Sequence, residues 1–148
     1  MKKITAVKNS VTIAFLFAFL VVLPAARASD INQETKVTFS QSVQISGHVL
    51  PAGTYWLVAP AEFNQHNLVR IFGADRITLY ATVITINAQR SEPTDNTAFT
   101  LAERGSALPE AIVTWFYPGN TIGREFLYGK QERKELGKDH QTTVVVGD

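Results

Sequence analysis

The stretch formed by residues 49–58 constrains the fold more than any other part of the sequence, because turn residues there separate two runs with alternating apolar side chains. Pro51 presets the backbone for the first central position of a type I turn. Gly53 can take the left-handed conformation with which a hairpin closes through a bulge. The sequence therefore predicts that residues 43–50 pair antiparallel with residues 54–58.

Further strands are predicted from the period-two alternation of apolar residues between turn signals. They cover residues 34–39, 68–72, 77–86, 97–104, 111–117 and 123–128, and the second and third of these form a hairpin across residues 73–76. Residues 79–84 are apolar on both faces, which predicts a central strand covered on both sides. About seven strands without a long helical run indicate an all-β fold, an antiparallel β-sandwich or small barrel of the Ig-like or prealbumin-like type.

Residues 1–28 carry the pattern of a signal peptide. Lys2, Lys3 and Lys8 form a basic start, residues 11–23 form an apolar centre, and a segment of small residues follows. As a helix, the apolar centre would span only roughly 20 Å at about 1.5 Å per residue, which is short of a bilayer core of about 30 Å. We therefore expect cleavage and export to the periplasm or the medium, rather than a membrane anchor.

Export would change the net charge of the chain and its expected partners. The leader carries four of the 14 basic residues and none of the 13 acidic ones, so cleavage leaves ten basic and 13 acidic residues, a net charge near −3. A mature domain of this charge lacks the basic surface that is typical of nucleic-acid-binding proteins. The sequence also has no cysteine, so a packed core must stabilise the exported domain without disulfides.

After the leader, the sequence divides into a β-sandwich domain in residues 29–129 and a charged tail in residues 130–148. The first half of the tail carries charges of both signs and predicts a short helical turn or a linker, whereas residues 142–146 favour a strand. This terminal strand is expected to extend the edge of the parent sheet. The alternative is association with a partner strand, because an unpaired strand edge is a template for pairing. The side chains available for such pairing are Thr142, Val144 and Val146.

Exposed aromatic side chains are the best candidates for ligand binding, because a flat ring can stack on a sugar or anchor a partner protein. Trp56 shares one strand face with Val58, while Trp115 and Tyr117 share a face with Val113. One face of each strand must fill the core. Core packing is the expected role of Trp115, and both roles are open for Trp56. The predicted ligand-binding residues are Trp56, Trp115 and Tyr117.

The sequence shows no pattern of a metal site or of a nucleophile held by a base. The three histidines, His48, His66 and His140, are widely spaced, so we expect surface histidines and no metal. No serine lies in a G-x-S-x-G elbow. Carboxylates for glycoside hydrolysis would have to come from scattered residues whose separation the sequence does not set. Those residues are Glu92, Asp95, Glu103, Glu110 and Glu125. We expect neither a cofactor nor catalysis.

Three runs of the sequence resemble an uncharacterised family of small exported β-rich proteins found in soil bacteria of the acidobacterial type. The runs are residues 35–39 with residues 50–55, residues 79–82, and residues 115–119 with residues 125–128. Their order and spacing agree with the family over nearly all of the mature chain up to Tyr128. The resemblance implies a secreted β-rich domain, and it assigns no functional residues.

Residues 50–55 are also similar to turns in the prealbumin-like repeats of bacterial surface proteins. In some of those repeats a lysine of the first strand forms an isopeptide bond with an asparagine of a late strand. Lys36 lies on the first predicted strand, but on the face opposite Val37 and Phe39, and residues 123–128 contain no asparagine. Lys36 is therefore expected to be a solvated strand lysine.

A complete β-strand pattern without a catalytic motif favours a non-catalytic exported β-sandwich that acts as a binding or structural module. One alternative is a carbohydrate-binding module that uses exposed aromatic residues. Another is a small extracytoplasmic hydrolase. The expected partner is a protein or a glycan, and nucleic acid is not expected.

Overall fold

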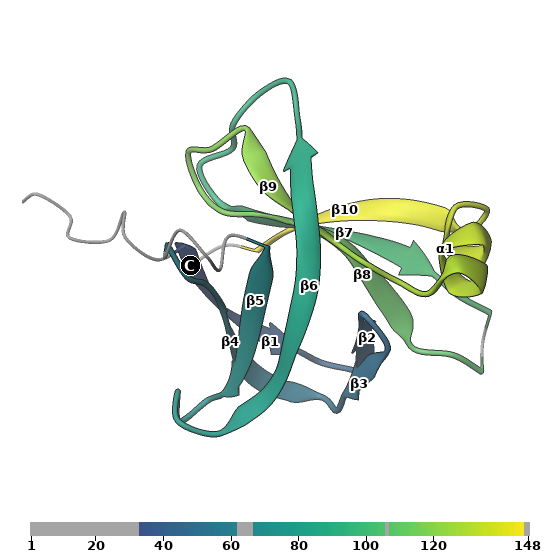
Figure 1. Ribbon diagram of the computed structural model, residues 1–148, viewed down its shortest axis with the longest axis horizontal. Helices are drawn as coiled ribbons and strands as arrows, with labels where there is room; N and C mark the ends of the chain where they lie inside the picture. Colours follow the sequence, from purple (N-terminus) through teal and green to yellow (C-terminus); the bar gives the residue numbers. More distant parts are fainter. Residues whose placement is uncertain (1–32, 62–66, 106, 147–148) are drawn as a thin grey trace, which may run out of the picture.

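The computed structural model describes residues 33–61, 67–105 and 107–146, and these are mostly β-strand (Figure 1). The predicted signal peptide in residues 1–28 lies outside the described residues. In chain order the elements are β1 (Gln33–Phe39), β2 (Val43–Ile45), β3 (His48–Leu50), β4 (Gly53–Ala59), β5 (Leu68–Gly73), β6 (Leu79–Gln89), β7 (Thr97–Glu103), β8 (Glu110–Phe116), β9 (Ile122–Phe126), α1 (Lys130–Leu136) and β10 (His140–Val146).

The strands form two layers that enclose one core. The first layer, sheet A, has the order β1-β4-β5-β6 and is antiparallel throughout. The second layer, sheet B, continues from the far half of β6 through β9, β8 and β7 to β10. The β2–β3 hairpin joins sheet B through a short parallel pair between β2 and β8. The predicted all-β sandwich is therefore confirmed, as a mixed sheet that does not close into a barrel.

Strand β6 connects the two layers because it is long enough to pair in both (Figure 1). Its first half pairs with β5 and its second half with β9. Ala81, Val83 and Thr85 point into the core, while Ile84 on the other face is 58% exposed, and Leu79 and Tyr80 at the start of the strand are each 52% exposed. The prediction that residues 79–84 are covered on both faces is therefore wrong. The apolar run includes outward side chains of an antiparallel layer, whose outer face is open to solvent.

The predicted pairing of residues 43–50 with residues 54–58 is also wrong. Ser46 and Gly47 both have positive φ, +47° and +83°, which is the conformation of a tight two-residue hairpin turn. Strand β2 therefore turns back on β3, and Ile45 faces His48 in the register. Gly53 begins β4, which pairs with β1 and β5. The hairpin predicted between β5 and β6 is confirmed.

The core lies between the two layers and includes a buried polar bridge. Trp115 is fully buried on β8, opposite Phe99 in the register of β7. Its indole Nε1 donates a hydrogen bond of 3.1 Å to Oγ1 of Thr35 on β1. The hydroxyl groups of Thr35 and Thr97 share a further hydrogen bond of 3.2 Å. This bridge joins β1 to sheet B at the edge where none of the described strands connects the layers by backbone pairing.

The charged tail folds onto the sandwich. Helix α1 buries Leu136 against the core, and β10 pairs with β7 in one antiparallel register over all seven residues. The prediction that the terminal strand extends the parent sheet is therefore confirmed. Figure 1 shows α1 beside the ends of β7 and β10.

Gly123 on β9 offers a test of the packing between β8 and β9. A Cβ atom at this position would lie 2.4 Å from a ring carbon of Phe116 and 2.5 Å from the carbonyl oxygen of Trp115. We expect Gly123→Ala to lower the free energy of unfolding by about 1–3 kcal/mol, because the side chain would overpack the sheet. Urea denaturation measures the change. Gly105→Ala is the control, since a Cβ there meets no atom within 4 Å; equal effects of both substitutions would contradict this packing.

Candidate functional site

The outer face of sheet A carries an aromatic ring beside two cationic side chains. Trp56 on β4 is half-buried, and its register neighbours are Lys36 on β1 and Phe72 on β5. The guanidinium carbon of Arg76 lies 4.7 Å from the centroid of the Trp56 ring, and Nζ of Lys36 lies 5.9 Å from it. Both distances are in the range of cation–π interactions. We call Lys36, Trp56, Phe72 and Arg76 the Trp56 face.

The turn between β5 and β6 places Arg76 over the ring. The carboxylate of Asp75 accepts hydrogen bonds from the backbone nitrogens of Ile77 (3.0 Å) and Thr78 (2.9 Å), and from the hydroxyl group of Thr78 (2.6 Å). These hydrogen bonds lower the pKa of Asp75, with the Thr78 hydroxyl as the largest cause. The carboxylate therefore fixes the turn in which Arg76 lies.

Arg76 itself adopts a conformation that favours glycine. Its φ is +59°, and a left-handed residue with a side chain costs roughly 1–2 kcal/mol relative to the right-handed form. The guanidinium group offsets part of this cost, because it stacks on Trp56 and forms an ion pair with Glu34 of β1. Unfavourable backbone geometry that is retained for the sake of a side chain is often found at functional positions.

A groove with a volume of about 340 Å³ adjoins Trp56 at the free edge of β1. Its lining comes from β1, β4, the start of β7, the loop after β8 and the end of β10. The lining residues are Glu34, Thr35, Lys36, Trp56, Thr97, Pro118 and Val146. The groove therefore combines an indole side chain, one cation and one carboxylate beside the outer edge of β1, which suits the binding of an extended, amphiphilic ligand.

The three predicted ligand-binding residues do not form one site. Trp115 is fully buried and bonded to Thr35, so it is a core residue. Tyr117 is half-buried, and its ring centroid lies 6.1 Å from that of Trp115. Burial raises the pKa of Tyr117, and the nearby charge of Arg124 lowers it to a smaller extent. Of the three, Trp56 is the residue that lies on the candidate face.

The residues considered for catalysis or metal binding are also dispersed. His48 and His140 are exposed on β3 and β10, while His66 lies outside the described residues. Glu110 and Glu125 line two different depressions, and Glu103 accepts a hydrogen bond of 3.2 Å from the hydroxyl group of Thr142. Within the described part of the chain, no group of three or more histidine, aspartate or glutamate side chains could hold a metal ion.

A second depression, of about 470 Å³, lies on the outer face of sheet B. Thr143, Thr100, Thr114 and Glu125 are successive partners in the registers of four neighbouring strands, so their side chains form a row across the sheet. The hydroxyl group of Thr114 donates a hydrogen bond of 2.8 Å to that of Thr100. At one end of the depression the guanidinium group of Arg90 lies 4.7 Å from the ring centroid of Phe116. This depression presents hydroxyl groups and a carboxylate to a polar ligand.

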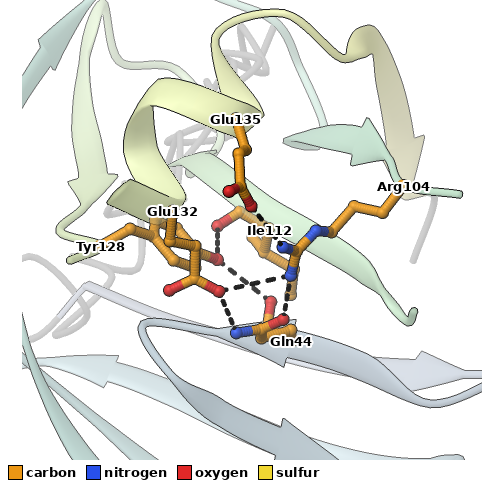
Figure 2. A network of polar contacts seen from close by, with 6 residues as sticks. All are labelled: Gln44, Arg104, Ile112, Tyr128, Glu132 and Glu135. Carbon is orange, nitrogen blue, oxygen red and sulfur yellow. Dashed lines mark hydrogen bonds and ion pairs between the residues drawn. The ribbon is translucent and has the colours of Figure 1, made fainter. Parts of the chain in front are cut away.

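A cluster of charged side chains beneath α1 has a structural role (Figure 2). Nη1 of Arg104 donates hydrogen bonds to Oε1 of Gln44 (2.5 Å) and to Oε1 of Glu132 (3.3 Å), and Gln44 Nε2 donates to the same Glu132 oxygen (2.5 Å). Nearby, the hydroxyl group of Tyr128 donates to the carbonyl oxygen of Ile112 (2.7 Å), and burial raises the pKa of Tyr128 well above its usual range. These groups satisfy one another, so the cluster fixes α1 against β2 and the end of β7.

Comparisons of this chain with family models, curated proteins and solved structures found no match. None of the helices in residues 33–61, 67–105 and 107–146 is long and apolar enough to span a membrane. The Trp56 face is therefore identified as a candidate binding site by its geometry alone.

Sequence reasoning identified Trp56 but missed the residues around it. Lys36 was expected to be a solvated strand lysine, and its side chain is exposed, with Nζ near the Trp56 ring. Phe72 and Arg76 were not considered, because their position beside Trp56 depends on the pairing of β4 with β5 and on the turn that follows. The one available signal was a turn residue with a long cationic side chain next to Asp75.

Asp75 gives the Trp56 face a dependence on pH. Because its pKa is lowered in the folded state, its contribution to stability is present above the unfolded value near 3.8 and is lost as the pH falls through the folded value. We expect Asp75→Asn to reduce the free energy of unfolding at pH 7, and the difference from the native chain to shrink below pH 3.8. Urea titrations across this range measure the difference. Asp95→Asn is an exposed control, and the same pH dependence in that variant would contradict the role of Asp75.

The Arg104 cluster is testable by truncation. The Arg104 side chain is 8% exposed and that of Glu132 is 25% exposed, so Arg104→Ala leaves a partly buried carboxylate and Gln44 without their shared donor. We expect a loss of about 2–3 kcal/mol in the free energy of unfolding, less than for a fully buried pair because solvent screens Glu132. Thermal and urea denaturation measure the loss. Lys134→Ala, on the exposed side of α1, is the control and should change the free energy of unfolding little. Similar losses in both variants would contradict the structural role of the Arg104 cluster.

Proposed function

We propose that this protein is a non-catalytic, exported β-sandwich that binds a partner through the Trp56 face and the adjoining groove. The observation that carries the proposal is the half-buried Trp56 with the cationic groups of Arg76 and Lys36 at cation–π distance from its ring. Export is supported by the signal-peptide pattern of residues 1–28. The resemblance to small exported β-rich proteins supports export and says nothing about a binding partner.

The geometry favours a polypeptide partner over a sugar. A sugar that stacks on an indole needs a free ring face, whereas the guanidinium group of Arg76 lies 4.7 Å from the Trp56 centroid and Lys36 lies nearby. Tryptophan and arginine together are the residues most enriched at the energetic centres of protein interfaces. Two cations against the single carboxylate of Glu34 suit a partner segment that carries carboxylates beside apolar side chains.

Site-specific photo-cross-linking in the envelope of the native host tests this proposal. A photoreactive phenylalanine analogue replaces Val58, which lies on the same strand face as Trp56, and a control replaces Val49, which is 56% exposed on β3. We expect a discrete protein adduct from position 58 that disappears with Trp56→Ala, and none from position 49. Equal adducts at both positions, or an adduct that survives Trp56→Ala, would reject the Trp56 face. A thermal melt verifies that Trp56→Ala is folded.

The depression on sheet B supports a second candidate function, carbohydrate binding. Its row of Thr143, Thr100, Thr114 and Glu125 offers the hydroxyl and carboxylate groups that orient sugar hydroxyls. On a glycan array, Thr114→Val and Glu125→Gln would then abolish binding, whereas Trp56→Ala would not. Glycan binding that is lost with Trp56→Ala would instead place a sugar on the Trp56 face and overturn the polypeptide partner.

A further inference from the structure

Strand β10 has an unusual free edge. Within the residues that the structure describes, it pairs only with β7, over seven residues and without a register shift. Its sequence, HQTTVVV, contains no proline and no lysine, arginine, aspartate or glutamate. Six of its seven residues are exposed, including Val144 at 40% and Val145 at 52%. Edge strands in monomeric proteins are usually short, charged, bulged or covered, and in the described part of the chain β10 has none of these protections.

The other free edges of the fold are protected. Strand β3 has only three residues and ends the sheet beyond β2. Strand β1 carries Glu34 and Lys36 and is held to sheet B through the side chains of Thr35 and Thr97. The backbone groups along the outer edge of β10 are therefore the ones best suited to pair with a further strand.

We propose that β10 pairs antiparallel with β10 of a second copy of this chain, so that sheet B continues across a two-fold axis. A register centred on Thr143 uses all seven residues and places each Thr143 opposite that of the other copy. Val144 then faces Thr142 of the other copy, and Val145 faces Gln141. Pairs of β-branched residues are favourable across antiparallel strands, and a two-fold axis is the commonest symmetry of homodimers.

The lack of charge on β10 is what makes a second copy fit. Two identical edges meet along their whole length, so any charged residue near the axis would face its own like charge. The β10 edge avoids this because its only ionisable side chain, His140, lies at one end. In the proposed register His140 comes to lie opposite Val146, which also lines the groove beside Trp56. The contact therefore reaches the groove through Val146, whereas Lys36, Trp56, Phe72 and Arg76 of the Trp56 face belong to β1, β4, β5 and the turn after β5.

Cysteine cross-linking tests the pairing directly, because the native sequence has no cysteine. Directly opposed residues in antiparallel strands have Cα atoms about 4.5–5.5 Å apart, within the range of about 4.4–6.8 Å that a disulfide spans. We expect Thr143→Cys in the full chain to form a covalent dimer under mild oxidation. Thr82→Cys is the matched control, an exposed threonine on β6 that pairs with Arg70 of β5 and lies outside the β10 edge. Equal cross-linking of both variants would overturn the proposal.

A charge at the axis provides the complementary test. We expect sedimentation equilibrium of the native chain to show a weak monomer–dimer equilibrium, and Thr143→Lys to lower the association constant roughly fivefold to tenfold by like-charge repulsion across the axis. Thr82→Lys should leave the constant unchanged. A native chain that stays monomeric up to millimolar concentration would overturn the pairing. Loss of this dimer with retained cross-linking at position 58 would leave the proposed function intact, so the two proposals can fail separately.

Discussion

The hydrogen bond from the indole of Trp115 to Thr35 is the interaction on which the arrangement of the two layers depends. On one side of the molecule the layers are continuous, because β6 pairs in both sheets. On the other side β1 has no backbone partner in sheet B among the described residues, and the layers meet through Trp115, Thr35 and Thr97. An unpaired indole nitrogen in the core would cost about 1–3 kcal/mol, so the large ring and its polar partner must be retained together.

The same open side explains where the candidate site lies. Because β1 is joined to sheet B by side chains rather than by a backbone ladder, a groove persists along its edge, and Trp56 lies beside it. The alternation of β4 sets the roles of its aromatic residues. Tyr55 and Leu57 point into the core, so Trp56 between them must point outward. The two tryptophans thus have opposite roles: Trp115 closes the core, and Trp56 marks the outer face.

Much of the fold could be predicted from the sequence, because strands β5 to β9 are runs rich in apolar and β-branched residues that turn residues separate. The pairing of residues 43–50 could not, because the decisive turn is formed by Ser46 and Gly47, and serine rarely takes positive φ. Alternation showed that Tyr55 and Trp56 face opposite ways, but not which of them is buried. The contact between Arg76 and Trp56 could not be predicted from the sequence. It depends on the register of three strands and on a left-handed backbone at a residue other than glycine.

The Arg104 cluster in the tail influences the character of the free β10 edge. Arg104 holds α1 through Glu132 and Gln44, and the chain passes from α1 into β10 within a few residues. The position of the Arg104 cluster therefore fixes where β10 begins and helps to keep β10 in register with β7. The charges of the tail are concentrated in the helix and the Arg104 cluster, while the strand that follows has none besides His140. This division leaves a strand edge without lysine, arginine, aspartate or glutamate, because Glu132 and Glu135, which pair with Arg104, lie in the helix that precedes β10.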